Sequence, residues 1–259
     1  MPRFAANLSM MFNEVPFLDR FRAASAAGFT AVEFLFPYEY SPEELESKAM
    51  AANTEVVLFN MPGGNWGAGE RGVAGLPGRE EEFREGVEKA LVYAERLGTP
   101  RLHAMAGIAP AGADISACRV TLVANLKFAA EKLAAKNITL LLEAINTRDM
   151  PGFIVSTQKD SHAICEEVGA PNMKMQMDIY HMQVMEGDLA NCLKRYASHC
   201  GHIQIAGCPE RHEPDTGEIR YEYLFRGLDE MGYAGWLGCE YRPAGKTADG
   251  LLWLSAATR

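Results

Sequence analysis

Features of a secreted or membrane protein are missing from this sequence. It holds six cysteines, but none forms a C-x-x-C pair and their spacing is irregular, whereas disulfide frameworks belong to smaller secreted chains. No run reaches the ~18 apolar residues that a membrane span needs. The opening stretch MPRFAANLSMMFNE is too short and too interrupted by polar residues for a signal peptide. These absences predict a cytoplasmic protein with reduced, mostly buried thiols.

Positive charge is also scarce. The 259 residues include 25 Lys and Arg against 34 Asp and Glu, which gives a net charge of −9. Proteins that bind nucleic acid or anionic membranes select for a basic face, so we expect neither as a partner. The deficit still allows a local basic pocket for a small anion. A hydrophobic content of 48% is enough for a sizeable core and argues against disorder.

The first expected strand is not followed by the glycine fingerprint that a doubly wound, dinucleotide-binding sheet would need. Short apolar strands alternate with amphipathic helices instead, which indicates parallel strands with helical crossovers. Eight such units in about 250 residues are the usual size of a (β/α)₈ TIM barrel. No linker divides the chain, so we predict a single barrel domain over residues 1–259. The eight expected strands are 4–10, 31–36, 55–60, 101–107, 139–146, 173–179, 202–207 and 235–241.

The expected helices carry signals at their ends. The stretch SPEEL has Ser41 as N-cap, Pro42 at the first helical position and Glu44 three residues after the cap, which is a capping box. Acidic residues open the following helix and Gly98 ends it. Other helices are expected to begin near Pro16, after Asp114, and near Ser156, Gly187, Tyr221 and Thr247.

Polar residues stand where the last four strands end. A carboxylate at the end of a strand buried on both faces is costly without a partner, yet TLLLEAIN places Glu143 there. Asp178, Gln204 and Glu240 hold the matching positions on the next three strands. Because the active site of such a barrel lies at the carboxyl ends of the strands, these four side chains should face one mouth.

The four side chains predict a metal site. Three carboxylates at one mouth repel one another, and a divalent cation removes that cost. Oxygen donors favour Mg²⁺ or Mn²⁺ over Zn²⁺, which prefers nitrogen and sulfur. The alternative is that the carboxylates pair with Arg148, Arg211 or Arg242, and the sequence leaves both possibilities open.

Three further residues are candidates for substrate contact. His181 follows three positions after Asp178, so a turn that begins there would bring its ring to the mouth. Arg211 lies in the loop after the seventh strand, where it could bind an anion. The long loop 61–78 holds seven glycines and Trp66, which suits a mobile lid over a small substrate. The alternatives are a structural histidine, a solvated arginine and an ordinary flexible loop. Four other histidines are expected to be structural: His103, His162, His199 and His202.

Several stretches together resemble the hydroxypyruvate isomerase family, a branch of the xylose-isomerase-like (β/α)₈ barrels. They are AVEFLFPY, AGERG, LPGREEEFR, LLLEAIN, PGF, DIYHMQ, HIQIAG, RHEPDTGEI and GCEY, and the resemblance spans almost the whole chain. It implies that Glu143 and Glu240 are the catalytic acid and base. It also implies a metal held by Glu143, Asp178, Gln204 and Glu240. His181 matches a substrate-clamping histidine of the related epimerases, whose third metal ligand is a histidine in place of Gln204.

The resemblance implies an isomerase that interconverts hydroxypyruvate and tartronate semialdehyde through an enediolate, with a small hydroxy-oxo acid as substrate. The alternative activity is that of a 2-oxo-tetronate isomerase or a ketose 3-epimerase. A metal-dependent DNA-repair endonuclease would need a basic face and a histidine-rich zinc cluster. Six histidines and a net charge of −9 oppose it. A homo-oligomer stays open, with a symmetric dimer as the commonest form.

Overall fold

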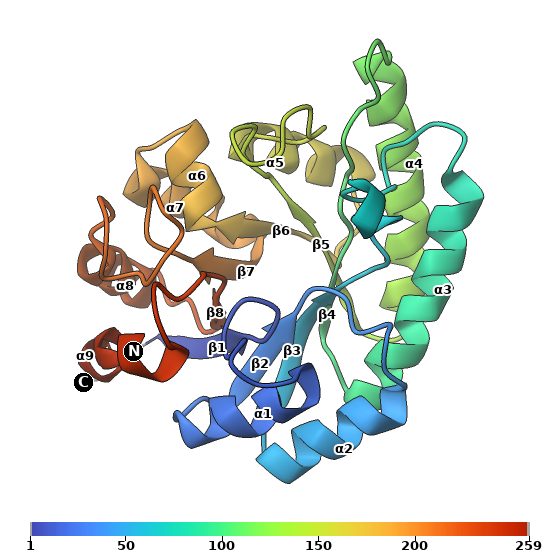
Figure 1. Cartoon of the computed structure of the whole chain (residues 1–259). Coiled ribbons are helices and arrows are strands. Elements are labelled where there is room, and N and C mark those ends of the chain that lie inside the picture. Colours follow the sequence, from blue (N-terminus) through green and yellow to red (C-terminus); the bar gives the residue numbers. More distant parts are fainter. Residues whose placement is uncertain (1, 258–259) are drawn as a thin grey trace.

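The computed structural model describes residues 2–257 and contains a closed barrel of eight parallel strands (Figure 1). Neighbouring strands are consecutive in the sequence, and β8 closes the ring by pairing with β1. The predicted (β/α)₈ barrel is therefore confirmed. The strands are β1 (Arg3–Asn7), β2 (Ala31–Phe34), β3 (Glu55–Asn60), β4 (Arg101–His103), β5 (Thr139–Glu143), β6 (Met173–Asp178), β7 (Cys200–Ile205) and β8 (Trp236–Cys239).

Some strands are shorter than expected. Strand β2 ends at Phe34 instead of residue 36, and β4 ends at His103 instead of residue 107. Beyond β4 the chain pairs with the loop that follows β3, where the backbone N–H of Gly75 donates to the carbonyl of Ala106 at 2.8 Å. A loop thus takes backbone hydrogen bonds that the apolar pattern assigned to the sheet.

Helices cover the outside of the barrel (Figure 1). They begin close to the expected positions, except that the last starts at Leu252 because a 3₁₀ turn occupies residues 247–250. Ser41 and Glu44 form the predicted capping box, Gly98 ends α3 with φ of 64°, and Asp114 caps α4. The helices are α1 (Phe17–Ala26), α2 (Pro42–Ala52), α3 (Glu80–Leu97), α4 (Ile115–Ala134), α5 (Gln158–Val168), α6 (Ile179–Met185), α7 (Leu189–Tyr196), α8 (Tyr221–Glu230) and α9 (Leu252–Ala257), with the 3₁₀ turns η1 (Trp66–Ala68), η2 (Ala197–His199) and η3 (Thr247–Gly250).

Strand residues alternate between the helix-covered core and the barrel interior. The ring of Phe4 packs edge-on against Phe225 of α8 and Trp253 of α9, with centroids 5.4 and 5.1 Å apart. Its neighbour Ala5 belongs to a separate small buried cluster. Asn7, two residues further on, contacts polar side chains of other strands. This period of two leaves the carboxyl end of the interior free for polar groups.

The thiols are unpaired, as predicted. All six cysteines are free, and Cys200 is the one that is partly exposed. Burial raises the pKa of Cys165 to about 12 and that of Cys192 to about 11, so these thiols stay protonated at neutral pH. Within residues 2–257, no helix is both long and apolar enough for a membrane crossing.

Gly238 of β8 lies against the buried side chain of Glu33, because a Cβ at this glycine would overlap the Glu33 carboxylate. We expect Gly238→Ala to lower the free energy of unfolding by about 1–3 kcal/mol, the range for overpacking an interior. Gly227→Ala is the control, since its Cβ would meet no atom within 4 Å and alanine favours a helix by about 1 kcal/mol. Urea unfolding measures both, and unchanged stability of Gly238→Ala would show that the space is not needed.

Candidate active site

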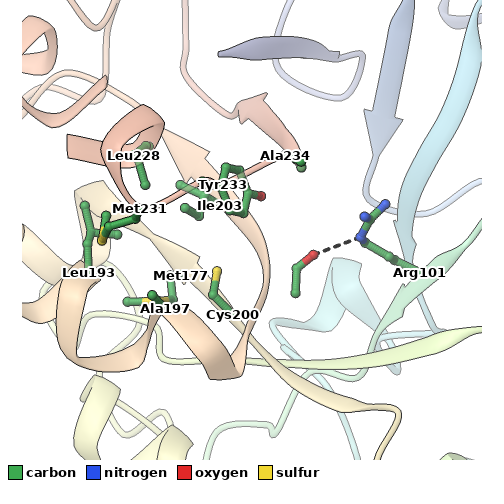
Figure 2. Close-up of a pocket in the computed structure, with 13 residues that line it drawn as sticks. Arg101, Met177, Leu193, Ala197, Cys200, Ile203, Leu228, Met231, Tyr233 and Ala234 are labelled. Carbon is green, nitrogen blue, oxygen red and sulfur yellow. Dashed lines mark hydrogen bonds between the residues drawn. The ribbon is translucent and has the colours of Figure 1, made fainter. Parts of the chain in front are cut away.

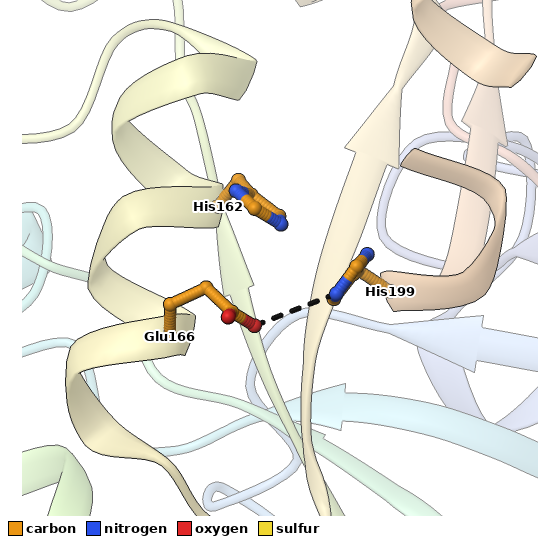
Figure 3. A group of neighbouring side chains, drawn as sticks. All are labelled: His162, Glu166 and His199. Carbon is orange, nitrogen blue, oxygen red and sulfur yellow. Dashed lines mark ion pairs between the residues drawn. The ribbon is translucent and has the colours of Figure 1, made fainter. Parts of the chain in front are cut away.

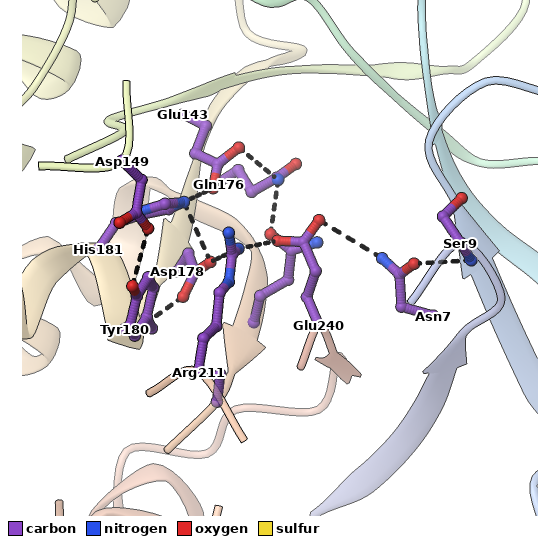
Figure 4. Close-up of polar contacts among 12 residues, drawn as sticks. Asn7, Ser9, Glu143, Asp149, Gln176, Asp178, Tyr180, His181, Arg211 and Glu240 are labelled. Carbon is purple, nitrogen blue, oxygen red and sulfur yellow. Dashed lines mark hydrogen bonds and ion pairs between the residues drawn. The ribbon is translucent and has the colours of Figure 1, made fainter. Parts of the chain in front are cut away.

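The four predicted oxygen donors lie at the carboxyl ends of neighbouring strands, and Figure 4 labels Glu143, Asp178 and Glu240 among them. Glu143 ends β5, Asp178 ends β6, and the sheet register places Asp178 beside Gln204 of β7. Glu240 directly follows β8. All four are buried, from 0% exposed at Asp178 to 8% at Glu240. We call these four side chains the oxygen cage.

A buried arginine bridges two members of the oxygen cage. Nη2 of Arg211 lies 3.0 Å from Oδ2 of Asp178 and 2.8 Å from Oε2 of Glu240 (Figure 4). The ion pairing that the sequence left open as an alternative to a metal is therefore present. The backbone of Arg211 has φ of 59°, which is uncommon for a residue other than glycine. The fold thus holds this loop in an unfavourable conformation that directs the arginine inward.

One guanidinium does not balance three carboxylates, and two negative charges are left. Burial raises the pKa of Glu143 well above its ordinary value, and the charges of Glu240 and Asp178 raise it further. Burial also raises the pKa of Glu240 to about 8, although Arg211 lowers it. Both carboxyls are therefore held toward their protonated forms unless another cation enters.

The free acceptor atoms of the oxygen cage fit a hard divalent cation. Oε1 of Glu143 is buried and has no hydrogen-bond donor among the described residues, and an unpaired buried oxygen is costly. Carboxylate and amide oxygens are the donors that Mg²⁺ and Mn²⁺ prefer. An ion of charge two would also match the two uncompensated negative charges.

His181 lies at this mouth as a hydrogen-bond donor. Its Nδ1 is 3.3 Å from the backbone N of Asn146, so Nδ1 accepts and the ring proton is on Nε2. Nε2 lies 3.5 Å from Oδ2 of Asp178 and 3.8 Å from Oε1 of Glu143. Burial lowers the pKa of His181 to about 3, although Asp178 raises it. The ring is therefore neutral, and its N–H faces the oxygen cage.

Two interior residues of the site were not among the predicted candidates. Gln176 of β6 donates from Nε2 to Oε2 of Glu143 at 3.1 Å and to Oε1 of Gln204 at 2.7 Å. Glu33 of β2 accepts from Nε2 of Gln204 at 2.8 Å. Signals for both exist: Gln176 lies two positions before Asp178, on the same strand face. Glu33 interrupts an apolar strand as Glu143 does.

His103, which the sequence left as structural, also lies beside the oxygen cage. Its Nδ1 is 3.2 Å from Oδ1 of Asn60 and 3.7 Å from Oε2 of Glu143. Burial lowers the pKa of His103 to about 3, and His202 lowers it further. This neutral ring therefore adds no compensating positive charge.

The loop 61–78 is less free than a mobile lid would be. Residues 72–76 are buried. Trp66 is half-buried in the tip of the loop, where its ring lies 4.8 Å from that of Phe36 and 4.0 Å from the guanidinium of Arg71. Only the tip around Trp66 is left to move, and contact between this ring and a substrate stays a prediction.

A cavity and a cluster of polar side chains lie away from the oxygen cage. A cavity of about 280 Å³ lies at the amino ends of β4 and β7, where Nε of Arg101 donates to the carbonyl of Gly201 at 2.8 Å (Figure 2). On the outer surface, the ligating atoms of His162, Glu166 and His199 lie within 4.8 Å of one another (Figure 3). Glu166 is exposed and lies 3.4 Å from Nε2 of His199. Both features are separate from the mouth.

Known proteins are similar to this chain over almost its full length. The family model described as xylose isomerase-like TIM barrel matches residues 21–257. The chain is 58% identical to a 2-oxo-tetronate isomerase from Cupriavidus necator and 48% identical to the hydroxypyruvate isomerase of Escherichia coli, with 98% of each chain covered in both cases. A solved structure titled AP endonuclease, family 2, from Brucella melitensis has 51% identity and a TM-score of 0.97, covering 99% of both chains.

The raised pKa values predict that the metal-free protein loses stability as pH rises. Folded protein keeps protons on Glu143 and Glu240 that the unfolded chain has released, because a free glutamate has a pKa of about 4.3. Unfolding therefore becomes easier from about pH 5 to about pH 8. We expect Glu240→Gln to flatten this dependence by up to about 1.4 kcal/mol per pH unit. Melting in EDTA across this range measures it, and equal slopes for variant and wild type would contradict the shift.

Proposed function

This chain belongs to the xylose isomerase-like TIM barrel family, and on that premise we propose that it is an isomerase of short 2-oxo acids with a hydroxyl on C3. Its relatives over nearly the full length include isomerases of this kind by name. In the reaction, the proton on C3 moves to C2, so the ketone and the hydroxyl exchange places. Hydroxypyruvate would give tartronate semialdehyde, and 2-oxo-tetronate would give the matching 3-oxo acid.

The observation that carries the proposal is the charge of the oxygen cage. Its three buried carboxylates face one guanidinium, and Glu143 keeps an unpaired oxygen. Glu143, Asp178, Gln204 and Glu240 would hold a Mg²⁺ or Mn²⁺ ion there. When bound, that ion supplies the positive charge that stabilises an enediolate.

Glu143 and Glu240 suit proton transfer between adjacent carbons. Both have raised pKa values, which brings them toward the working pH of a general acid or base. One takes the proton from C3 and the other delivers a proton to C2, while the proton of the C3 hydroxyl passes to the C2 oxygen. In the reverse direction the two roles exchange.

Two donors are available for the substrate itself. Nε of Arg211 is buried and has no partner in the described part of the chain, so it can bind the substrate carboxylate while Nη2 stays on the cage. The Nε2–H of His181 can donate to a substrate oxygen at the same mouth. Trp66 would cover the bound acid from the tip of its loop.

A DNA-repair endonuclease is the rival function, because a solved structure with 51% identity is titled AP endonuclease, family 2. The net charge of −9 opposes binding to a polyanion. The oxygen cage also lacks the nitrogen and sulfur ligands that zinc prefers. Incubation with Mg²⁺ and hydroxypyruvate in deuterated water separates the two, since an isomerase incorporates deuterium at carbon and a nuclease does not.

We expect Glu143→Gln and Glu240→Gln each to lower kcat by about 10²-fold or more, the range for lost acid–base catalysis. Glu213→Gln is the matched control, because Glu213 is also buried but bonds to the backbone of Ala244. Steady-state kinetics of the three variants measure the effect. Near-native turnover in either of the first two would rule out the assigned role.

We expect the enzyme to prefer substrates that carry a carboxylate. A hydrogen bond to a charged group contributes about 1.5–3 kcal/mol, so we expect kcat/KM for 2-oxo-tetronate and hydroxypyruvate to exceed that for free ketoses at least about tenfold. Among the acids, 2-oxo-tetronate should be preferred, since the relative of that name has 58% identity against 48%. Arg211→Met should remove the preference for acids. A ketose turned over as fast as either acid would instead support an epimerase.

A further inference from the structure

A second polar layer lies inside the barrel, on the far side of Gln204 from Gln176. Its centre is Glu33 of β2, which is 1% exposed. Oε1 of Glu33 accepts from Nδ2 of Asn7 at 3.0 Å and from Nε2 of Gln204 at 2.8 Å. Oε2 lies 2.7 Å from Nε2 of His202, which must donate because a carboxylate only accepts. Three donors from β1 and β7 thus converge on one buried acid.

This layer decides how the Gln204 amide is oriented. The two ends of an amide have nearly the same shape, so hydrogen bonds alone select which one faces a given direction. Glu33 accepts, and therefore holds the NH₂ group of Gln204. Gln176 donates to the Gln204 oxygen at 2.7 Å, and its own NH₂ is fixed by Glu143 at 3.1 Å. The oxygen of Gln204 therefore faces Gln176, whose NH₂ group also bonds to Glu143 of the oxygen cage.

We infer that Glu33 is a positioning residue that presents the Gln204 carbonyl oxygen, rather than its amide nitrogen, to a divalent cation. This inference rests on the proposed function. Glu33 acts on the neighbouring Glu240 as well, because Asn7 donates to Glu33 and lies 3.5 Å from Oε1 of Glu240. The amide of Asn7 cannot reverse its orientation, because its oxygen accepts a hydrogen bond from the backbone N–H of Ser9 at 3.1 Å.

Glu33 adds negative charge beside an already acidic site. An apolar side chain would avoid that charge but would leave the buried donors of Asn7, His202 and Gln204 unpaired. The chain also makes room for it, because a side chain at Gly238 would overlap the Glu33 carboxylate. An amide in place of Glu33 has only one oxygen, so it could not accept from all three donors. Its NH₂ group would instead face one of those donors.

Mn²⁺ binding to the purified protein, followed by electron paramagnetic resonance of the free ion, tests the inference without relying on activity. We expect Glu33→Gln to weaken Mn²⁺ binding by about 10–100-fold, the range for lost partners of metal ligands. The double variant Glu33→Gln/Gln204→Glu keeps the total charge and reverses the hydrogen bond, since the new amide donates to the new carboxylate. It should recover Mn²⁺ affinity to within about tenfold of wild type. Glu213→Gln should bind Mn²⁺ as wild type does.

The outcomes separate the inference from the proposed function. Failure of the wild type to bind Mn²⁺ would overturn the metal site and the proposed function with it. A wild type that binds while Glu33→Gln binds equally well would overturn the role of Glu33 alone. If Glu33→Gln does not fold, the double variant decides: a folded double variant with wild-type affinity supports the inference, and one that binds more than about 100-fold weaker refutes it.

Discussion

The mouth of this barrel is governed by one constraint, the burial of more negative charge than the chain balances. Closed parallel strands bring the residues at their carboxyl ends to a common place, and three of those residues are acids. Arg211 reaches two of the carboxylates and offsets one charge. The remaining negative charge is an electrostatic cost of folding that a small divalent ion would offset under the proposed function. The raised pKa values of Glu143 and Glu240 express the same cost.

Hydrogen-bond direction orders the interior as much as charge does. Gln176 donates to Glu143 and to Gln204, and Gln204 donates to Glu33. The Glu33 carboxylate at one end accepts from the Gln204 NH₂ group, so the Gln204 oxygen is left to accept from Gln176. A network in which every member fixes the next gives a rigid site from flexible side chains.

Local pattern explains what the sequence could predict. Alternating strands and helices give the barrel, and a carboxylate in an apolar run marks Glu143. The orientation of Arg211 was beyond reach because it depends on a loop residue with φ of 59°, which follows no periodic pattern. The proton on His181 depends on a backbone N–H of Asn146, in another loop. Glu33 carried the same local signal as Glu143. The role of Glu33 could not be predicted from that signal, because it depends on contact with Gln204, which lies 171 positions away in the sequence.

Asp178 links the mouth to the start of a helix. Its Oδ1 accepts the backbone N–H of Tyr180 at 2.8 Å and so caps α6, while Oδ2 faces Arg211 at 3.0 Å. Moving this carboxylate toward one neighbour lengthens its contact with the other. An ion too large or too small for the mouth would therefore loosen the first turn of α6, which carries His181. Under the proposed function, an ion of the wrong size would thus also displace His181, the proposed substrate contact.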